Sequence, residues 1–261
     1  MDTTVTASVA GRQRGSTLGL LAAVIVAAWG LACWAEWSGV AGKLHHHALY
    51  HDARPLWVSA LLFLGAWQVM TAAMMLPSSL PLARLFVVAS RNAPQRRAAL
   101  ALFLIAYFVV WTAFAAIAFA GDMTLHRIVD GWPWLDARPQ IIAAAALAAA
   151  GIYQFTPLKD ACLRGCRHPA AYLLRHYRRG ALGGWRLGFG HGLLCVGCCW
   201  ALMLVMFGVG VAHLGWMGVL AVIMLVEKTT SFGERLVLPV GIAAVALALV
   251  ALVWPGTVPG L

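Results

Sequence analysis

Apolar segments long enough to cross a lipid bilayer recur along this chain and leave few folds open to it. A transmembrane helix needs about 20 mostly apolar residues, and lipid-exposed backbone must form its hydrogen bonds within a helix or a closed barrel. We expect spans at 17–35, 56–76, 98–120, 141–156, 187–211, 216–226 and 236–254. The sequence therefore predicts an all-α polytopic membrane helix bundle of about seven transmembrane helices.

The composition supports a membrane protein and argues against other classes. Of the 261 residues, 62% are hydrophobic and 11% are charged, whereas a soluble domain carries about 25% charged residues. The net charge of +10 comes mostly from two loops, so it does not indicate a nucleic-acid partner. The sequence contains no P-loop and no H-E-x-x-H motif, and we therefore expect neither ATP hydrolysis nor a zinc peptidase.

Loop charges give the predicted spans a direction across the membrane. The loop at 158–186 carries seven Lys or Arg residues against Asp160 alone, and the loop before the third span is also basic. The positive-inside rule places such loops in the cytoplasm. We therefore expect a cytoplasmic N-terminal tail at 1–16, a single membrane domain at 17–255 and a basic cytoplasmic loop at 158–186 within it.

The apolar run at 188–206 carries a stripe of side chains that bind soft metals. Residues three and four apart are neighbours on a helix surface, so this spacing places six such side chains on one side of the helix. They are His191, Cys195, Cys198, Cys199, Met203 and Met206. Thiolates and thioethers favour Cu(I), and thiolates with imidazole also suit zinc. Ordinary packing of Cys and Met in an apolar helix is the alternative interpretation.

The second span ends in a group of methionines beside a proline. Met70 and Met74 share a helix face, and Met75 follows directly. Pro77 is expected to break the helix and to free a backbone carbonyl near Met74. The predicted directions of the spans put these methionines at about the depth of Cys195, so they add metal ligands if the two spans are neighbours. Gap filling beside a kink is the alternative role.

Cys162 and Cys166 form a C-x3-C pair in the basic loop. Cationic neighbours such as Lys159 and Arg164 favour the thiolate form, which binds metals and acts as a nucleophile. The pair therefore suits Cu(I) binding, half of a zinc site, or a dithiol that cycles between oxidation states. Two unrelated reduced cysteines are the remaining interpretation.

The sequence leaves two further groups of polar residues open. His45–His47 and His51 would concentrate a metal outside the membrane, although a histidine run is only a compositional indication. Glu227 and Lys228 end an apolar run. Ionisable residues at membrane depth often mark functional sites, whereas opposite charges at a helix end often serve as interfacial anchors.

Four blocks of the sequence carry a family resemblance. They are MTAAMMLPSSLP at 70–81, YQFTPLKDACLRGCRHP at 153–169, GFGHGLLCVGCCWALMLVMFGVG at 188–210 and LVEK at 225–228. The blocks resemble a bacterial family of predicted metal-binding integral membrane proteins of unknown function, some of which are labelled copper chaperones. The resemblance implies association with a metal, and it implies nothing about the histidine run.

Together these features predict a multi-pass protein of the bacterial inner membrane that binds a soft metal. Cu(I) is the expected ion, with zinc as the alternative. The protein would transport the metal or exchange it with a metal-donor or metal-acceptor protein, and it would not be an enzyme. We expect the two thiols of the basic loop to exchange metal on the cytoplasmic side and the other ligands to hold it within the membrane. The expected ligands are Met70, Met74, Met75, Cys162, Cys166, His191, Cys195, Cys198, Cys199 and Met203.

Two other functions are compatible with the same residues. A membrane thiol-disulfide oxidoreductase would use Cys195 with Cys198 as a C-x-x-C and Cys162 with Cys166 as a second pair. The predicted outer loops contain no cysteine, which counts against a dithiol that serves secreted proteins. A structural subunit of a membrane complex is the third alternative.

Overall fold

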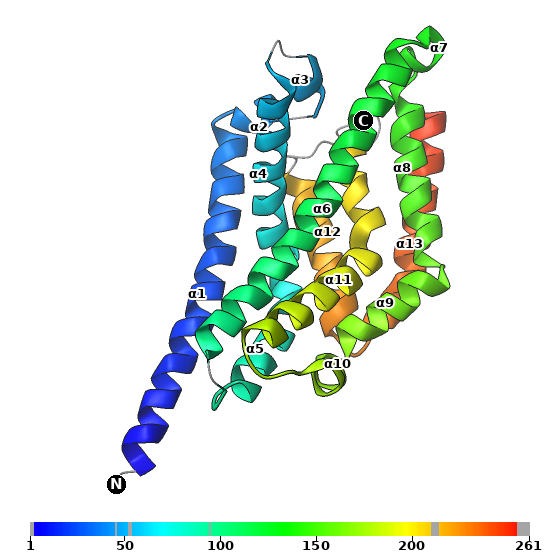
Figure 1. Cartoon of the computed structure of the whole chain (residues 1–261). Coiled ribbons are helices and arrows are strands. Elements are labelled where there is room, and N and C mark those ends of the chain that lie inside the picture. Colours follow the sequence, from blue (N-terminus) through cyan, green and yellow to red (C-terminus); the bar gives the residue numbers. More distant parts are fainter. Residues whose placement is uncertain (1–2, 45, 52–53, 94, 210–213, 255–261) are drawn as a thin grey trace.

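Long helices that run side by side form the body of the protein. The computed structural model describes residues 3–44, 46–51, 54–93, 95–209 and 214–254, and all regular structure in these residues is helical. The helices along the long axis of the bundle are α1 (Thr3–Trp37), α4 (Leu56–Met74), α6 (Arg96–Asp130), α8 (Pro139–Gln154), α11 (Ala181–Val209), α12 (Leu214–Thr229) and α13 (Gly233–Val253) (Figure 1). The prediction of an all-α bundle is therefore confirmed.

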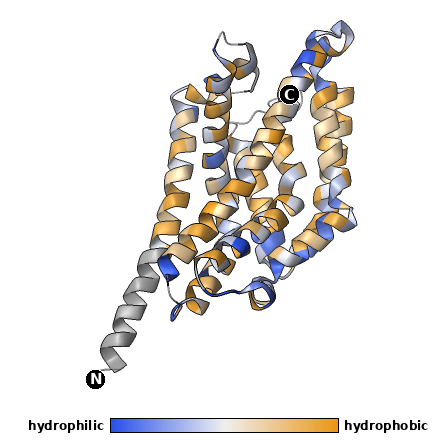
Figure 2. Cartoon of the chain, in the orientation of Figure 1, coloured by the Kyte–Doolittle hydropathy of each residue, from blue (hydrophilic) through white to orange (hydrophobic). Residues whose placement is uncertain are grey.

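The shorter helices gather at the two ends of this bundle. Helices α2 (Val40–Lys43), α3 (His46–His51) and α7 (Pro133–Asp136) lie at the upper end in Figure 1. Helices α5 (Leu76–Ala89), α9 (Pro157–Arg167) and α10 (Pro169–His176) lie toward the lower end, where α1 also begins. Apolar residues predominate along the long helices, and hydrophilic residues gather at both ends (Figure 2). His45 and the side chains of His46, His47 and His51 lie outside the described residues.

Within the described residues, five helices are long and apolar enough to cross a membrane: α1 from Leu18 onward, α4, α6, α11 up to Met206, and α13. A sixth span results if α8 and α9 are counted together, although the two helices are bent by 67° at their junction. Helix α12, the predicted sixth span, has 16 residues and falls short of the usual spanning length.

The predicted basic loop at 158–186 is largely helical. Thr156 caps α9, because its hydroxyl accepts a hydrogen bond from the Lys159 backbone N–H at 3.2 Å, and Pro157 occupies the first turn. Helix α9 then runs back at an angle to α8 and lies beside α11, and α10 follows it at the lower end (Figure 1). Likewise, residues 3–16, which the sequence suggests to be a tail, continue α1 as helix. Charge alone predicts a loop in this segment. The cap at Thr156 and the proline at position 157 instead start a helix that packs against the bundle.

The break predicted at the end of the second span is present. Helix α4 ends at Met74, and α5 begins at Leu76 with Pro77 in its first turn. The carbonyl oxygen of Met75 at the break accepts hydrogen bonds from the Ser78 hydroxyl at 2.8 Å and the Ser79 hydroxyl at 3.3 Å. The polar backbone at the break is therefore satisfied inside the protein, as membrane depth requires.

Small residues let α11 approach α6 closely. A Cβ atom added at Gly184 would collide with the carbonyl oxygen of Ala99, and one at Gly188 would collide with that of Phe103. Contacts of this kind between small residues are a common way for apolar helices to associate. The close approach brings the Tyr107 hydroxyl of α6 within 3.1 Å of Cys195 Sγ on α11.

Candidate metal centre

Four thiols from two helices meet in the interior. Cys198 Sγ lies 3.5 Å from Cys199 Sγ and 3.8 Å from Cys166 Sγ on α9. The three α11 cysteines, Cys195 among them, are at most 1% exposed, and Cys166 is 8% exposed. The stripe predicted on one side of α11 therefore faces the protein interior. We call Cys166, Cys195, Cys198 and Cys199 the thiol cluster.

A lysine from α12 lies within the thiol cluster. The ammonium nitrogen of Lys228 lies 3.1 Å from Cys195 Sγ, 3.3 Å from the Ser78 hydroxyl oxygen and 3.8 Å from Met75 Sδ. Lys228 is only 4% exposed, so the structure does not support an interfacial anchor at this position. A buried ammonium is costly unless a negative or strongly polar partner compensates it, and the thiols supply that partner here.

The methionines predicted as ligands belong to the same buried region. Met70, Met74 and Met75 from α4 and its end, and Met203 from α11, are at most 3% exposed and lie in one apolar cluster with all four thiols. Met75, directly after α4, reaches the thiols through Lys228 of α12, since Met75 Sδ and Cys195 Sγ both contact the ammonium. The end of the second predicted span and the thiols on α11 therefore meet at this lysine.

Cys162 and Cys166 occupy different surroundings although both lie on α9. Cys166 points into the thiol cluster, whereas Cys162 is half-buried against α11, where a Cβ atom on Gly197 would lie 2.5 Å from its sulfur. The pair is therefore packed against α11 and is not a separate chelating group in an exposed loop.

The cations near this pair have other partners. Lys159 Nζ forms an ion pair with Glu227 at 2.6 Å, and Arg164 pairs with Asp160 at the surface. Arg167 donates to the Glu227 carbonyl oxygen at 2.6 Å and pairs with Glu234 at 3.2 Å. The interpretation of these residues as thiol-activating neighbours is therefore not supported, because carboxylates and a backbone carbonyl engage them.

His191 lies one helical turn below Cys195, outside the sulfur contacts. Its Nε2 atom lies 3.1 Å from the Ser79 hydroxyl, and its ring stacks on Tyr107 and Phe103. Its Nδ1 atom is buried, and no group in the described part of the chain forms a hydrogen bond with it. This nitrogen is therefore available as a ligand at the lower side of the thiol cluster.

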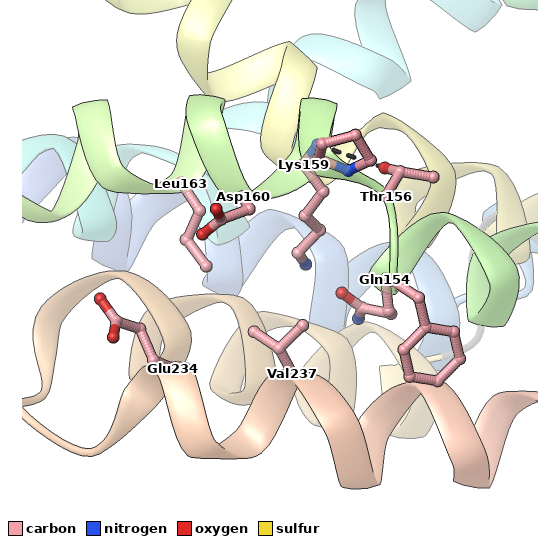
Figure 3. Close-up of a pocket in the computed structure, with 9 residues that line it drawn as sticks. Gln154, Thr156, Lys159, Asp160, Leu163, Glu234 and Val237 are labelled. Carbon is pink, nitrogen blue, oxygen red and sulfur yellow. Dashed lines mark hydrogen bonds between the residues drawn. The ribbon is translucent and has the colours of Figure 1, made fainter.

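A buried polar network connects the thiol cluster with a pocket. Glu227, the neighbour of Lys228, binds Lys159 Nζ and accepts a hydrogen bond from the Gln154 amide at 3.3 Å. Lys159 and Gln154 line a pocket of about 400 Å³ between the α8–α9 junction and α13 (Figure 3). Leu163, which directly follows Cys162 and precedes Cys166 by three residues, lines the same pocket. The pocket thus lies beside the helix that carries these two thiols.

The sulfurs make contacts different from those that a C-x-x-C dithiol would need. Cys198 Sγ contacts Cys166 Sγ and Cys199 Sγ, and the side chains of Cys195 and Cys199 also form a hydrogen bond. The Cys198 thiol donates to the Cys195 backbone carbonyl at 3.3 Å, so its hydrogen bond to this predicted partner is made to the backbone. No group of three or more His, Cys, Asp or Glu residues in the described ranges already has the spacing of a metal site.

Long apolar helices around a buried set of thiols, thioethers and one lysine define an α-helical, membrane-type protein with ligands suited to a soft metal ion. A comparison with protein families identifies the family to which the chain belongs. A family model described as copper chaperone, PpoB2, matches residues 64–251, and the chain therefore belongs to this family. The comparisons with curated proteins and with solved structures find no match.

The family match confirms the resemblance found in the sequence and supports a role in copper handling. It covers every predicted ligand, and it also covers Tyr107, Lys159 and Lys228, which the list of predicted ligands omits. Lys228 is detectable from the sequence as a charge at the end of an apolar run. No sequence signal separates the buried Lys159 from the exposed cations of the same segment, because its burial depends on the fold of α9.

Proposed function

We propose that this protein binds Cu(I) as its cargo at the thiol cluster and passes it across the bacterial inner membrane or to a partner protein. The observation that carries this proposal is the convergence of four buried thiols from α9 and α11. Thiolates bind Cu(I) strongly, and the neighbouring Met75 and Met203 add thioethers, which share this preference for soft ions.

The spacing of the sulfurs fits a metal ion with small adjustments. Thiolate sulfurs lie about 2.3 Å from a bound zinc ion, so sulfurs in a three- or four-coordinate site are roughly 4 Å apart. The distances of 3.5 Å and 3.8 Å around Cys198 are close to this value. Rotations of the side chains of Cys195 and Cys199 would then complete a trigonal or tetrahedral site without movement of the helices.

Lys228 would compensate part of the negative charge of such a site inside the protein. A Cu(I) ion bound by three thiolates carries two net negative charges, and charges buried away from water are costly unless they are compensated. The ammonium 3.1 Å from Cys195 supplies one positive charge directly at the thiols. The Lys159–Glu227 pair adds no net charge, so it does not cancel this effect.

Copper would reach the thiols from the lower end of the bundle, which the positive-inside rule assigns to the cytoplasm. His191, whose Nδ1 atom is free, precedes the thiols on α11 and so lies on that side of them, and the half-buried Cys162 lies level with them beside Gly197. A donor protein would pass the ion to Cys162 first and then to Cys166. The ion would move by exchange between sulfur ligands, so it would not have to be hydrated on its way through the protein.

X-ray absorption on the anaerobically purified protein loaded with Cu(I) tests this proposal. We expect mainly sulfur scattering around the copper and one tightly held ion per chain. Cys166→Ser should weaken retention more than Cys162→Ser, because Cys166 contacts Cys198 whereas Cys162 packs beside Gly197. A spectrum dominated by nitrogen or oxygen would reject the Cu(I)–thiolate site, and retention of zinc in preference to copper would reassign the metal.

A further inference from the structure

The methionines have an unusually narrow distribution in this fold. Nine methionines occur in the sequence, and seven of them lie on α4, at its end, on α11 or on α12. These seven are at most 3% exposed and belong to the same buried cluster as the thiols. The set includes three that the metal centre does not use: Met206, Met217 and Met224.

Helices α11 and α12 form an antiparallel pair whose register is set by one contact. The Lys228 ammonium touches Cys195 Sγ, and α11 ends 14 residues after Cys195 while α12 begins 14 residues before Lys228. Because a lysine side chain spans about one helical turn, positions at equal separation from this contact lie at the same height to within about one turn. Met224 is thus near the height of Cys199, since each is four residues from the contact. Met217 is near the height of Met206, since each is eleven residues from it.

These methionines also lie on the helix faces that carry the thiol contact. At 100° per residue, Cys195, Cys199, Met203 and Met206 fall within about 80° of each other around α11. Met217, Met224 and Lys228 are separated by seven and four residues, which places them on one face of α12. With a rise of 1.5 Å per residue, the highest pair lies about 16 Å above the level of Cys195.

One further thioether continues this series. Helix α6 runs parallel to α11, because Ala99 and Phe103 meet Gly184 and Gly188 in the same order. This register places Met123 of α6 about two residues above the level of Met206. Met123 is buried in the same cluster, three residues before His126. The thioethers therefore extend from the thiol cluster to the end of the bundle that carries α3 and α7 (Figure 1).

The chemistry of thioethers suits movement of copper better than its storage. A thioether is a neutral soft ligand, so it prefers Cu(I) to hard cations but adds no charge to the apolar interior. Passage of an ion requires several successive sites that bind it weakly enough to release it. Methionine as a flexible filler of irregular gaps explains its burial, but not its matched heights on two antiparallel helices.

We propose that Met224, Met203, Met206, Met217 and Met123 form a path of thioether sites along which Cu(I) leaves the thiol cluster toward the α3–α7 end. This inference rests on the proposed function, because the thiol cluster is the source of the ion. It assigns the protein to transmembrane transfer of copper and not only to exchange with a protein on one side.

A paired measurement on the full-length protein in proteoliposomes tests the path. Copper retained by the purified protein reports on the thiol cluster, and Cu(I) captured by a chelator inside the vesicles reports on passage. For Met206→Leu/Met217→Leu we expect unchanged retention and passage slowed by roughly tenfold, equivalent to about 1.4 kcal/mol of barrier. Leucine keeps the volume and removes only the sulfur. Leu220→Met, a buried change on the same helix, is the matched control and should pass copper normally.

The outcomes separate the two proposals. Normal passage in the double variant overturns the path and leaves the thiol cluster intact as a proposal. Normal retention by the wild-type protein without passage into vesicles also overturns the path and supports exchange on one side only. A wild-type protein that retains no Cu(I) overturns the proposed function itself, and the path falls with it.

Discussion

Lys228 is the residue that most clearly distinguishes this interior from an ordinary apolar core. The chain has three lysines, of which Lys159 and Lys228 are buried. Lys159 has a carboxylate partner in Glu227, as buried cations usually do. Among the described residues, Lys228 instead has two sulfurs and the Ser78 hydroxyl as partners. A buried ammonium in contact with the Cys195 thiol fits the proposal that the thiol cluster carries negative charge when it binds Cu(I).

Replacement of Lys228 by methionine should therefore weaken copper binding. A hydrogen bond to a charged group contributes about 1.5–3 kcal/mol, so we expect affinity for Cu(I) to fall roughly 10- to 100-fold. Competition with a Cu(I) chelator measures this loss. Lys228→Arg keeps the charge and should retain more affinity, and the exposed Lys43→Met serves as the control. Equal affinity in Lys228→Met would show that the ammonium does not compensate the thiolates.

Helix α11 combines two functions along one face, because Gly184, Gly188 and Cys195 are spaced by nearly whole turns. Gly184 and Gly188 let it approach α6, and the cysteines about two to four turns later contact α9 and α12. The closeness of the helices is what brings Tyr107 to hydrogen-bonding distance of Cys195. The geometry of the candidate metal centre thus depends on glycines, which have no side chain to bind a metal.

A methyl group on Gly188 should disturb the α6–α11 contact. The added Cβ of Gly188→Ala would collide with the Phe103 carbonyl oxygen, and because backbone cannot rotate away, the helices must separate. We expect a loss of about 1–3 kcal/mol in stability and weaker copper retention. Thermal unfolding in detergent measures the stability. Gly218→Ala on α12 has no atom within 4 Å of its added Cβ and should be neutral or slightly stabilising. Equal stability of both variants would contradict tight packing at Gly188.

The molecule as a whole has two chemically different ends. The lower end holds the break between α8 and α9, the pocket and the polar network around Glu227 (Figures 1 and 3). The upper end holds α3 and α7, and Tyr50 of α3 donates a hydrogen bond to Asp130 of α6 at 2.8 Å. The thiol cluster lies closer to the lower end, so in the proposed function the orientation in the membrane decides which compartment would supply the metal.

The orientation can be measured with single cysteines at the two ends. Asn92 and Ala137 are exposed, in the link before α6 and directly after α7 respectively. In a Cys33→Ser background, a membrane-impermeant thiol reagent should label Ala137→Cys in intact spheroplasts and Asn92→Cys only in inverted vesicles. This follows from the excess of Arg and Lys in the segments at the lower end. Labelling of Asn92→Cys from outside would reverse the topology and the proposed direction of transfer.

The predicted and observed positions of individual residues show which features can be predicted from the sequence. The stripe from Cys195 to Met206 and the break at Pro77 are both present as predicted, because a helix period and a proline act locally. The position of Cys166 differs from its prediction, since the cap at Thr156 turns the supposed loop into a helix against α11. The burial of Lys159 and the contact of Tyr107 with Cys195 depend on packing between distant segments.

The sequence by itself determined the helical class, the break in the second span and the identity of most candidate ligands. These properties follow from apolar length, helical periodicity and ligand chemistry, which act over a few turns of one segment. Only the tertiary structure decided that Cys166 meets Cys198 and that Lys228 links α4 to the thiols. The helical periodicity of the sequence shows which face of a helix is buried. Close approach of small residues and capping of short helices determine which neighbouring helix that face packs against.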